Sequence, residues 1–196
     1  MTIYFIGGFF PEGGINDINK KSRGVIQYAA HAFQENLVRG ISGFKGRDLR
    51  IINMPFVGSY PLRYADHYVW GARSRDIFNS SIITEVGFLN YFVAKYFARF
   101  FSLLFFLLKN NINKESKIIV YSLHTPFLAA TWLATKIKRR KIQFFVIVPD
   151  LPEFMSDSKN IFYLLFKKID GFFSEFFLGK SNGCILLTEG MADYLR

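Results

Sequence analysis

His124, Asp150 and Glu189 each come shortly after an apolar run of the chain, and they are the side chains best placed to do chemistry. The carboxyl ends of parallel strands meet at one edge of a sheet, where doubly wound proteins bind their ligands. Each residue alone has an ordinary explanation, since a strand-end histidine often makes a structural hydrogen bond and Asp150 can organise a proline-rich turn. Three polar groups at one edge favour a shared site, with His124 and Asp150 as candidate catalytic residues.

Glycines supply a second candidate feature at the same edge. Gly7 and Gly8 follow the first strand-like run, and Gly13 and Gly14 come six residues later, ahead of a helix expected to begin near Ser22. A glycine-rich turn between a strand and a helix allows backbone N–H groups to approach a phosphate. The spacing differs from GxGxxG and no acidic residue has a clear ribose role, which argues against a dinucleotide site.

No spacing of His, Cys and carboxylate residues in the sequence indicates a metal site, and no Ser–His–Asp arrangement is visible. The single cysteine, Cys184, excludes a disulfide framework and fits a reducing cytoplasm. The apolar start Ile3–Phe10 lacks a basic leader and runs on towards Pro and Gly. It is therefore interpreted as a strand and not as a secretory signal.

Strand-like and helix-like segments alternate along the chain. Short apolar runs typical of buried parallel strands are Ile3–Ile6, Leu49–Asn53, Lys117–Ser122, Gln143–Val148 and Cys184–Leu187. Helical patterns fall at Arg23–Arg39, Glu85–Lys109, Pro126–Arg140 and Asn160–Phe177, and Tyr60–Ser81 is expected to be a loop and a short helix. The alternation predicts an α/β fold: a doubly wound, Rossmann-like parallel sheet between two helix layers.

The segment Glu85–Lys109 carries a narrow polar stripe on an otherwise apolar and aromatic helix. At about 100° per residue, its polar positions lie within roughly 80° of one another; they are Lys95, Arg99, Ser102 and Lys109. Two interpretations are open: burial between the sheet and its neighbours, or a place in a bilayer interface with the basic residues reaching phosphates. A spanning helix is disfavoured, since Lys95 and Arg99 would each cost roughly 2.5–3.5 kcal/mol near the bilayer centre.

A second amphipathic pattern lies in Asn160–Phe177. We expect its apolar positions to pack in the core, with a contribution to a membrane surface as the alternative. These positions are Ile161, Leu165, Ile169, Phe172, Phe173 and Phe176.

The amino-acid composition limits the kinds of partner that the protein is expected to bind. The chain has 25 Lys and Arg against 15 Asp and Glu, a formal charge of +10, and 24 Phe. This charge suits nucleic acid, an anionic bilayer or a phosphorylated substrate, and the aromatic helices beside it favour a membrane surface. No nucleic-acid partner is expected, because the basic residues are dispersed and the dense run Lys136–Lys141 ends an ordinary helix.

In four stretches the chain resembles the family 4 GT-B glycosyltransferases of bacterial polysaccharide synthesis. The stretches are IYFIGGFFPEGG (Ile3–Gly14), YSLHTPFLAA (Tyr121–Ala130), IVPDLPEFM (Ile147–Met155) and LLTEGMADYL (Leu186–Leu195), in the family's order. They cover essentially the whole chain as the N-terminal half of that fold. The resemblance implies that residues 1–196 are the acceptor-side domain, with the C-terminal donor-binding domain absent from this sequence.

The resemblance also implies residue roles and partners. His124 would hydrogen-bond the transferred sugar and support the positive charge that develops on it. The residues near the donor diphosphate would be Gly7, Gly8, Gly13 and Gly14, and those lining the cleft would be Asp150 and Glu189. The donor would be a nucleotide sugar, the acceptor a lipid-linked or glycan chain, and neither a metal nor another cofactor is expected. Such domains often rest on the bilayer, which implies a cytoplasmic protein attached peripherally to the inner face of the cell membrane.

The chain breaks off one or two turns into a helix that Thr188 can cap, which we interpret as the sign of a fragment. The expected function is therefore the acceptor-binding half of a retaining glycosyltransferase, inactive until a donor domain is supplied, for example as a separate polypeptide. The alternative is a non-catalytic membrane-associated module that binds a partner, or a subunit of a split glycosyltransferase.

Overall fold

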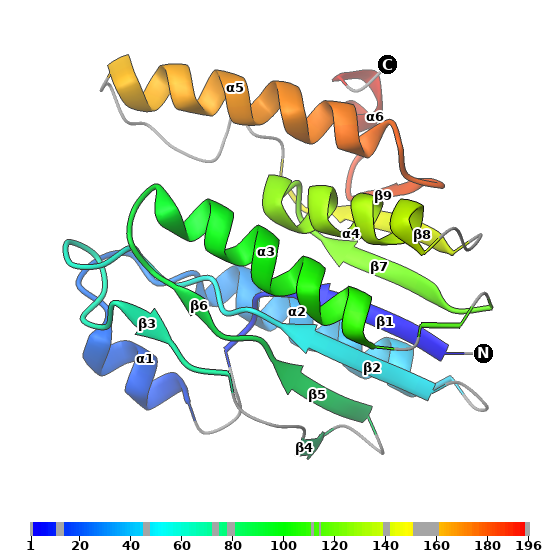
Figure 1. The fold of residues 1–196 in the computed structure, drawn as a ribbon, viewed down its shortest axis with the longest axis horizontal. Helices are drawn as coiled ribbons and strands as arrows, with labels where there is room; N and C mark the ends of the chain where they lie inside the picture. The colour runs from blue at the N-terminus through cyan, green and yellow to red at the C-terminus, as the bar shows by residue number, and fades with distance from the viewer. Residues whose placement is uncertain are drawn as a thin grey trace.

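The computed structural model describes residues 2–10, 14–44, 48–71, 75–77, 81–110, 112–113, 115–138, 142–150 and 161–194. Its centre is a seven-stranded sheet, in which six strands are parallel and β4 runs antiparallel to its neighbour (Figure 1). In spatial order the strands are β4 (Arg75–Ile77), β5 (Ser81–Glu85), β2 (Asp48–Asn53), β1 (Thr2–Gly7), β7 (Lys117–Tyr121), β8 (Gln143–Val148) and β9 (Cys184–Leu186). The predicted doubly wound, Rossmann-like α/β class is confirmed.

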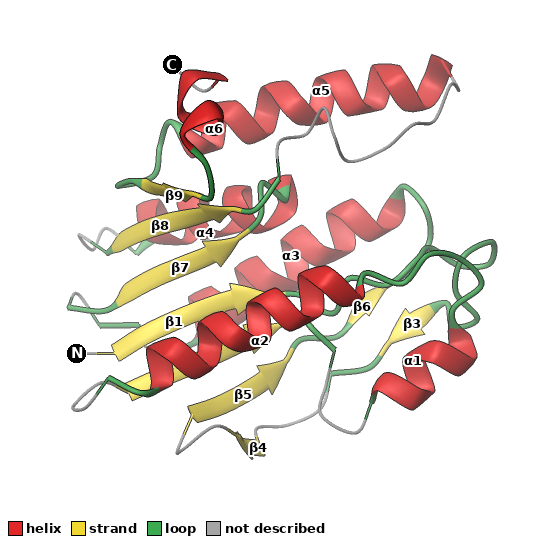
Figure 2. Cartoon of the chain, turned by 180° about the vertical axis from the view of Figure 1, so that it is seen from behind, coloured by secondary structure: helices red, strands yellow, loops and turns green. Residues whose placement is uncertain are grey.

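Both faces of the sheet are covered, which explains the nearly continuous apolar strands. On β1, Tyr4 and Ile6 join the core under α3 (Ala94–Lys109) and α4 (Thr125–Ile137), while Ile3 and Phe5 join the core under α2 (Tyr28–Ser42). The helix α5 (Ile161–Leu178) packs beside α4. Figure 2, seen from behind, shows α2 across the opposite face, so the domain has three layers.

The direction of winding reverses between β1 and β7. The chain passes from β1 outward to β2 and β5, and later adds β7, β8 and β9 on the other side of β1. Strands β1 and β7 are parallel neighbours, with Ile6 opposite Val120. The crevice beyond the carboxyl ends of such a pair is the usual ligand-binding place of doubly wound folds.

Smaller elements lie beyond the carboxyl ends of the strands. They are α1 (Ile15–Lys21) and the two-stranded antiparallel sheet of β3 (Tyr68–Val69) and β6 (Phe88–Leu89), while α6 (Glu189–Tyr194) follows β9. The helix α1 was not predicted, and the expected helix Arg23–Arg39 begins only at Tyr28 and continues to Ser42. No helix occurs in the described part of Tyr60–Ser81, where one was expected.

The predicted start of the helix Glu85–Lys109 is also wrong, because tertiary hydrogen bonds hold its first part extended. Val86 N–H donates to the Asn53 carbonyl at 2.9 Å. Asn90, fully buried, donates through Nδ2 to the carbonyls of Gly58 (2.9 Å) and Asp66 (3.1 Å). These bonds override the helical periodicity, and α3 begins only at Ala94.

The helix α3 turns the Lys95–Arg99 part of its polar stripe towards the sheet, whereas Lys109 at its far end is exposed. Arg99 is 2% exposed and packs inward with Leu103 and Leu107. On the outer side Phe97, Phe101 and Phe105 are 61–69% exposed. The interpretation in which Lys95 and Arg99 reach outward to lipid phosphates is therefore wrong.

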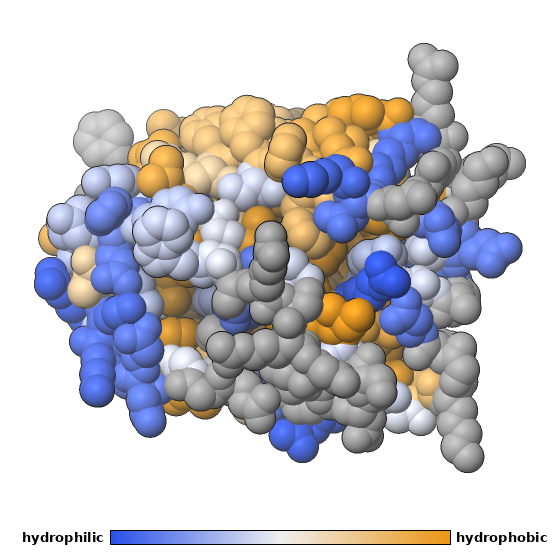
Figure 3. All heavy atoms as spheres, turned by 60° about the horizontal axis from the view of Figure 1, so that its bottom comes forward, coloured by the Kyte–Doolittle hydropathy of each residue, from blue (hydrophilic) through white to orange (hydrophobic). Residues whose placement is uncertain are grey.

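The apolar side of α5 points outward as well. Ser174 is buried, whereas the positions expected in the core are exposed, namely Leu165, Ile169, Phe172, Phe173 and Phe176. Core packing of these five residues is thus contradicted. In Figure 3 the molecule is rotated so that the front of Figure 1, where α3 lies, faces upward. A band of hydrophobic residues runs along that upper edge. Among the helices of the described ranges, none is long and apolar enough to cross a membrane.

Candidate functional site

His124 lies at the reversal point of the sheet, between the end of β7 and the start of α4. A left-handed turn at Ser122 (φ 73°), whose N–H donates to the Ile147 carbonyl at 2.8 Å, leads the chain out of the strand. His124 is the N-cap of α4, and its carbonyl accepts the N–H of Phe127 at 2.9 Å. Pro126 in the first turn has no N–H to leave unpaired, so the helix begins here readily.

Aromatic rings surround the imidazole of His124, which remains partly exposed. The ring centroids of Phe127, Phe56 and Tyr96 lie 4.6, 5.5 and 5.7 Å from that of His124. Two of these contacts are edge-to-face, the geometry that aromatic rings prefer. The imidazole is therefore held in one orientation by packing.

Arg99 defines the proton position on this ring. Its Nη1 lies 3.1 Å from His124 Nε2. Because a guanidinium has only donors, Nε2 must accept, and the proton of the neutral ring is on Nδ1. Burial and the positive charges of Arg99 and Lys95 lower the pKa of His124 well below 6.5. The imidazole is thus neutral at physiological pH, and no described residue forms a hydrogen bond with Nδ1.

Arg99 is buried among neutral groups. Its Nη2 donates to the Pro55 carbonyl, and its guanidinium carbon lies 4.4 Å from the ring centroid of Phe88 and 5.4 Å from that of Phe56. These rings offer cation–π stabilisation. Burial nevertheless lowers the pKa of Arg99 to about 9, and Nε has no hydrogen-bond partner in the described chain.

Lys95 lies one helical turn before Arg99 on the same side of α3. Its Nζ donates to the Val57 carbonyl. Burial, followed by repulsion from Arg99 and Arg63, lowers the pKa of Lys95 to about 6. Sequence reasoning placed Lys95 and Arg99 on one stripe but missed them as partners of His124, because a stripe does not reveal which neighbour it faces.

The Gly7–Gly8 turn packs tightly against neighbouring side chains. A Cβ at Gly7 would lie 2.6 Å from Gln34 Oε1, and one at Gly8 would lie 2.6 Å from the ring of Phe56. Gly8 N–H donates to Gln34 Oε1 at 2.8 Å, and the Gly8 carbonyl accepts Phe56 N–H at 2.8 Å. In this conformation the Gly8 N–H is bonded within the chain. The turn is thus linked to the His124 site through Phe56.

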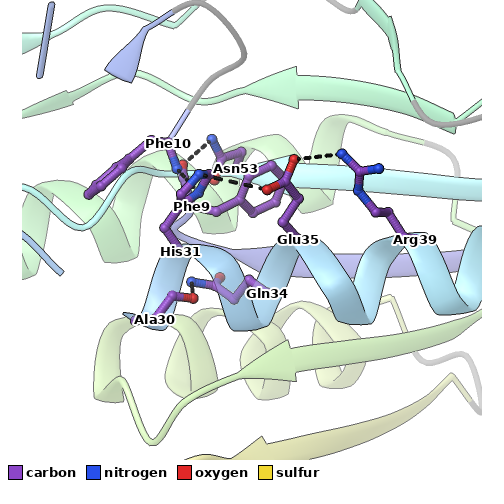
Figure 4. A network of polar contacts seen from close by, with 8 residues as sticks. All are labelled: Phe9, Phe10, Ala30, His31, Gln34, Glu35, Arg39 and Asn53. Atoms are coloured by element: carbon purple, nitrogen blue, oxygen red, sulfur yellow. Dashed lines mark hydrogen bonds and ion pairs between the residues drawn. The ribbon is translucent and has the colours of Figure 1, made fainter. Parts of the chain in front are cut away.

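A polar network holds the residues after this turn to α2 and β2 (Figure 4). Phe10 N–H donates to His31 Nδ1 at 3.2 Å, and Asn53 Nδ2 donates to the Phe9 carbonyl at 2.9 Å. Buried Gln34 also donates to the Ala30 carbonyl at 3.0 Å. Sequence reasoning missed Gln34 and Asn53, although a polar residue on the inward side of a helix and an Asn ending an apolar strand were available signals.

The remaining candidates lie along the same edge without contacting His124. Asp150 is exposed and follows β8. Burial of Tyr121, together with the negative charge of Asp150, raises the pKa of Tyr121 to about 12. Glu189 is the exposed first residue of α6. Gly14 is the N-cap of α1, and Gly13 lies outside the described residues. Within the described ranges, no hydrogen bond or ion pair joins His124 to either acid, and no cluster of acids, His and Cys could hold a metal.

Comparison with known proteins identifies no family for this chain. No protein-family model matches it, and no curated protein sequence matches it. Function is therefore inferred from the fold and from the geometry around His124.

Proposed function

We propose that this chain is the acceptor-binding half of a retaining glycosyltransferase, which transfers a sugar from a nucleotide-sugar donor to a lipid-linked or polysaccharide acceptor. The observation that supports this most is the neutral, partly exposed His124 at the point where the sheet reverses. The four stretches that resemble family 4 enzymes agree with it. Without a donor-binding domain the chain is expected to be inactive.

The neutral state of His124 matters for this chemistry. Glycosyl transfer passes through an oxocarbenium-like state, in which positive charge develops on the sugar ring. A neutral Nδ1–H donates a hydrogen bond to a sugar hydroxyl without adding a full opposing charge, whereas an imidazolium would repel the developing cation. Arg99 keeps the ring in the neutral, Nδ1-protonated form. We assign Asp150 and Glu189 to the lining of the same site.

The test is sugar transfer from a labelled nucleotide sugar to a membrane extract, with the chain alone and with a family 4 C-terminal domain added in trans. Transfer is expected only with the added domain. His124→Ala should lower it by about 10²–10³-fold, the usual cost of one catalytic donor. His67→Ala is the matched control, because His67 is an exposed histidine in another loop. Equal transfer by the two variants would refute the role of His124.

A second candidate function, a membrane-associated module, is favoured by the outer face of the helix layer. We define the outer face as the exposed side chains of α3 and α5, which flank α4 on one side of the sheet: Phe97, Phe101, Phe105, Leu165, Ile169, Phe172, Phe173 and Phe176. Phenylalanines on helices lying parallel to a bilayer insert into its interface, and a formal charge of +10 complements anionic lipids. We propose that this face attaches the protein peripherally to the inner surface of the membrane.

Vesicle co-sedimentation distinguishes this role from sugar transfer. The double variant Phe101→Ser and Phe105→Ser should lose binding to phosphatidylglycerol vesicles, whereas Phe44→Ser should keep it, since Phe44 is exposed after α2. Vesicle binding that survives in His124→Ala, together with no transfer under any condition, would favour the membrane module over the enzyme. Loss of a dimer in the double variant would instead identify the outer face as a contact between two copies.

A further inference from the structure

Two basic side chains, Lys95 and Arg99, lie at the His124 site without an anionic partner in the described chain. Lys95 bonds to the Val57 carbonyl, and Arg99 bonds to the Pro55 carbonyl and to His124 Nε2. Neither is among the ion pairs of the described residues. Carbonyl dipoles compensate only part of the cost of burying a charge, so this cluster attracts an anion.

Two helices add to the positive potential at this place. Helices α3 and α4 pack together, and both begin at the carboxyl edge of the sheet, α3 after Val93 and α4 at His124. Neither has an acidic residue in its first turn or a side-chain cap, so the positive ends of both dipoles are uncompensated. From α5, the backbone carbonyl of Asp170 accepts a hydrogen bond from Thr125 Oγ1 at 3.2 Å, and burial raises the pKa of the Asp170 carboxyl group, which disfavours its charged form.

The side chains that a ligand can reach are Lys95 and His124. Both are partly exposed, whereas Arg99 is enclosed. A bound anion favours the protonated form of Lys95, whose ammonium has three N–H donors, of which Val57 takes one. Lys95 precedes Arg99 by one turn of α3, and Arg99 Nη1 lies 3.1 Å from His124 Nε2, which places Lys95 beside the same site.

We propose that Lys95 Nζ binds a phosphate group of the acceptor, with Arg99 as the positioning residue beside it, while His124 Nδ1–H is left for the sugar. The acceptor on this view is a phosphate or diphosphate ester, and this identification rests on the proposed transferase function. Phosphate fits because it brings two negative charges and several acceptor oxygens to donors that are fixed in place. The phosphate belongs either to a lipid diphosphate or to a water-soluble phosphate ester.

The experiment is calorimetric titration of the full chain with inorganic pyrophosphate at low salt. We expect saturable binding that Lys95→Gln weakens at least about tenfold, since a charged donor is lost. Lys109→Gln, the matched control, removes the same charge from the exposed far end of α3 and should change the affinity less than about twofold. Equal weakening in both variants, or none in Lys95→Gln, would overturn the proposal.

A second measurement covers the case in which Lys95→Gln does not fold. In the unsubstituted chain, bound pyrophosphate should raise the pKa of Lys95. NMR of the Lys95 ε-methylene group measures this pKa. An unchanged pKa at saturation would overturn the site. Farnesyl diphosphate that binds more tightly than pyrophosphate would assign the phosphate to a lipid acceptor, and equal affinities would assign it to a soluble ester.

The two proposals fail in distinguishable ways. Pyrophosphate binding without sugar transfer, even with a donor domain, would refute the transferase and leave an anion site of another purpose. Transfer that depends on His124, in a chain that does not bind pyrophosphate, would refute only the phosphate site.

Discussion

Replacing Lys95 with Met should stabilise the protein, although it removes a hydrogen bond. Burial and two neighbouring cations lower the pKa of Lys95 from 10.5 to about 6. In the unfolded chain the same ammonium is in water at its ordinary pKa. Folding therefore carries an electrostatic cost that Met, an apolar side chain of similar length, does not have.

The pKa difference gives the size and the pH dependence of this cost. At about 1.36 kcal/mol for each pKa unit, the upper limit below pH 6 is about 6 kcal/mol. Part of it is offset because the side chain stays partly exposed, and the Val57 carbonyl loses its donor in the variant. We expect a net gain of about 1–3 kcal/mol at pH 7. Between the folded and unfolded pKa the unfolded state holds the extra proton, so the stability of the unsubstituted chain rises with pH.

Urea unfolding followed by circular dichroism, from about pH 6.5 to about pH 9.5, measures both effects. The difference in stability between the variant and the unsubstituted chain should shrink as the pH rises, by up to about 1.36 kcal/mol per pH unit. Lys109→Met is the control, because Lys109 is exposed on the same helix. A gain that does not vary with pH, or one that Lys109→Met reproduces, would refute the reasoning.

Three further substitutions and one comparison, Gly40→Ala, test the packing around the site. Arg99→Met should raise the pKa of His124, seen by histidine NMR, because a positive charge beside the ring is lost; an unchanged pKa would show that Arg99 does not control the ring. Gly8→Ala should cost about 1–3 kcal/mol in urea unfolding, because its Cβ meets an aromatic ring. Gly40→Ala, in open space on α2, should instead stabilise by about 0.5–1 kcal/mol. Leu103→Ala should cost about 2–5 kcal/mol, as expected for a fully buried leucine, and a cost below 1 kcal/mol would contradict the inward orientation of this side of α3.

The strands at the centre of the sheet could be predicted because a strand buried on both faces is a short, nearly continuous apolar run in the sequence. The runs at β1, β2, β7 and β8 are short and mostly apolar, and all four were located from the sequence. The short apolar run of β9 was located too, although β9 lies exposed at the edge of the sheet. The runs of β4 and β5 were missed, since SIITE at Ser81–Glu85 mixes polar and apolar residues near the edge of the sheet. The place of His124 followed from the strand before it, whereas its tautomer depends on Arg99, which is 25 residues away in the chain.

The orientation of α3 is what the periodicity could not show, because the same polar stripe is compatible with either side facing the sheet. The loop after β2 decides it: the carbonyls of Pro55 and Val57 point at α3 and need donors, which Arg99 and Lys95 supply. Satisfying these carbonyls forces the opposite side of the helix, with Phe101, outward. One rotation of α3 therefore produces both the pair of basic side chains at the His124 site and the apolar outer face. In the two proposals together, the helix that attaches the protein to the bilayer also carries the residue that binds the acceptor phosphate.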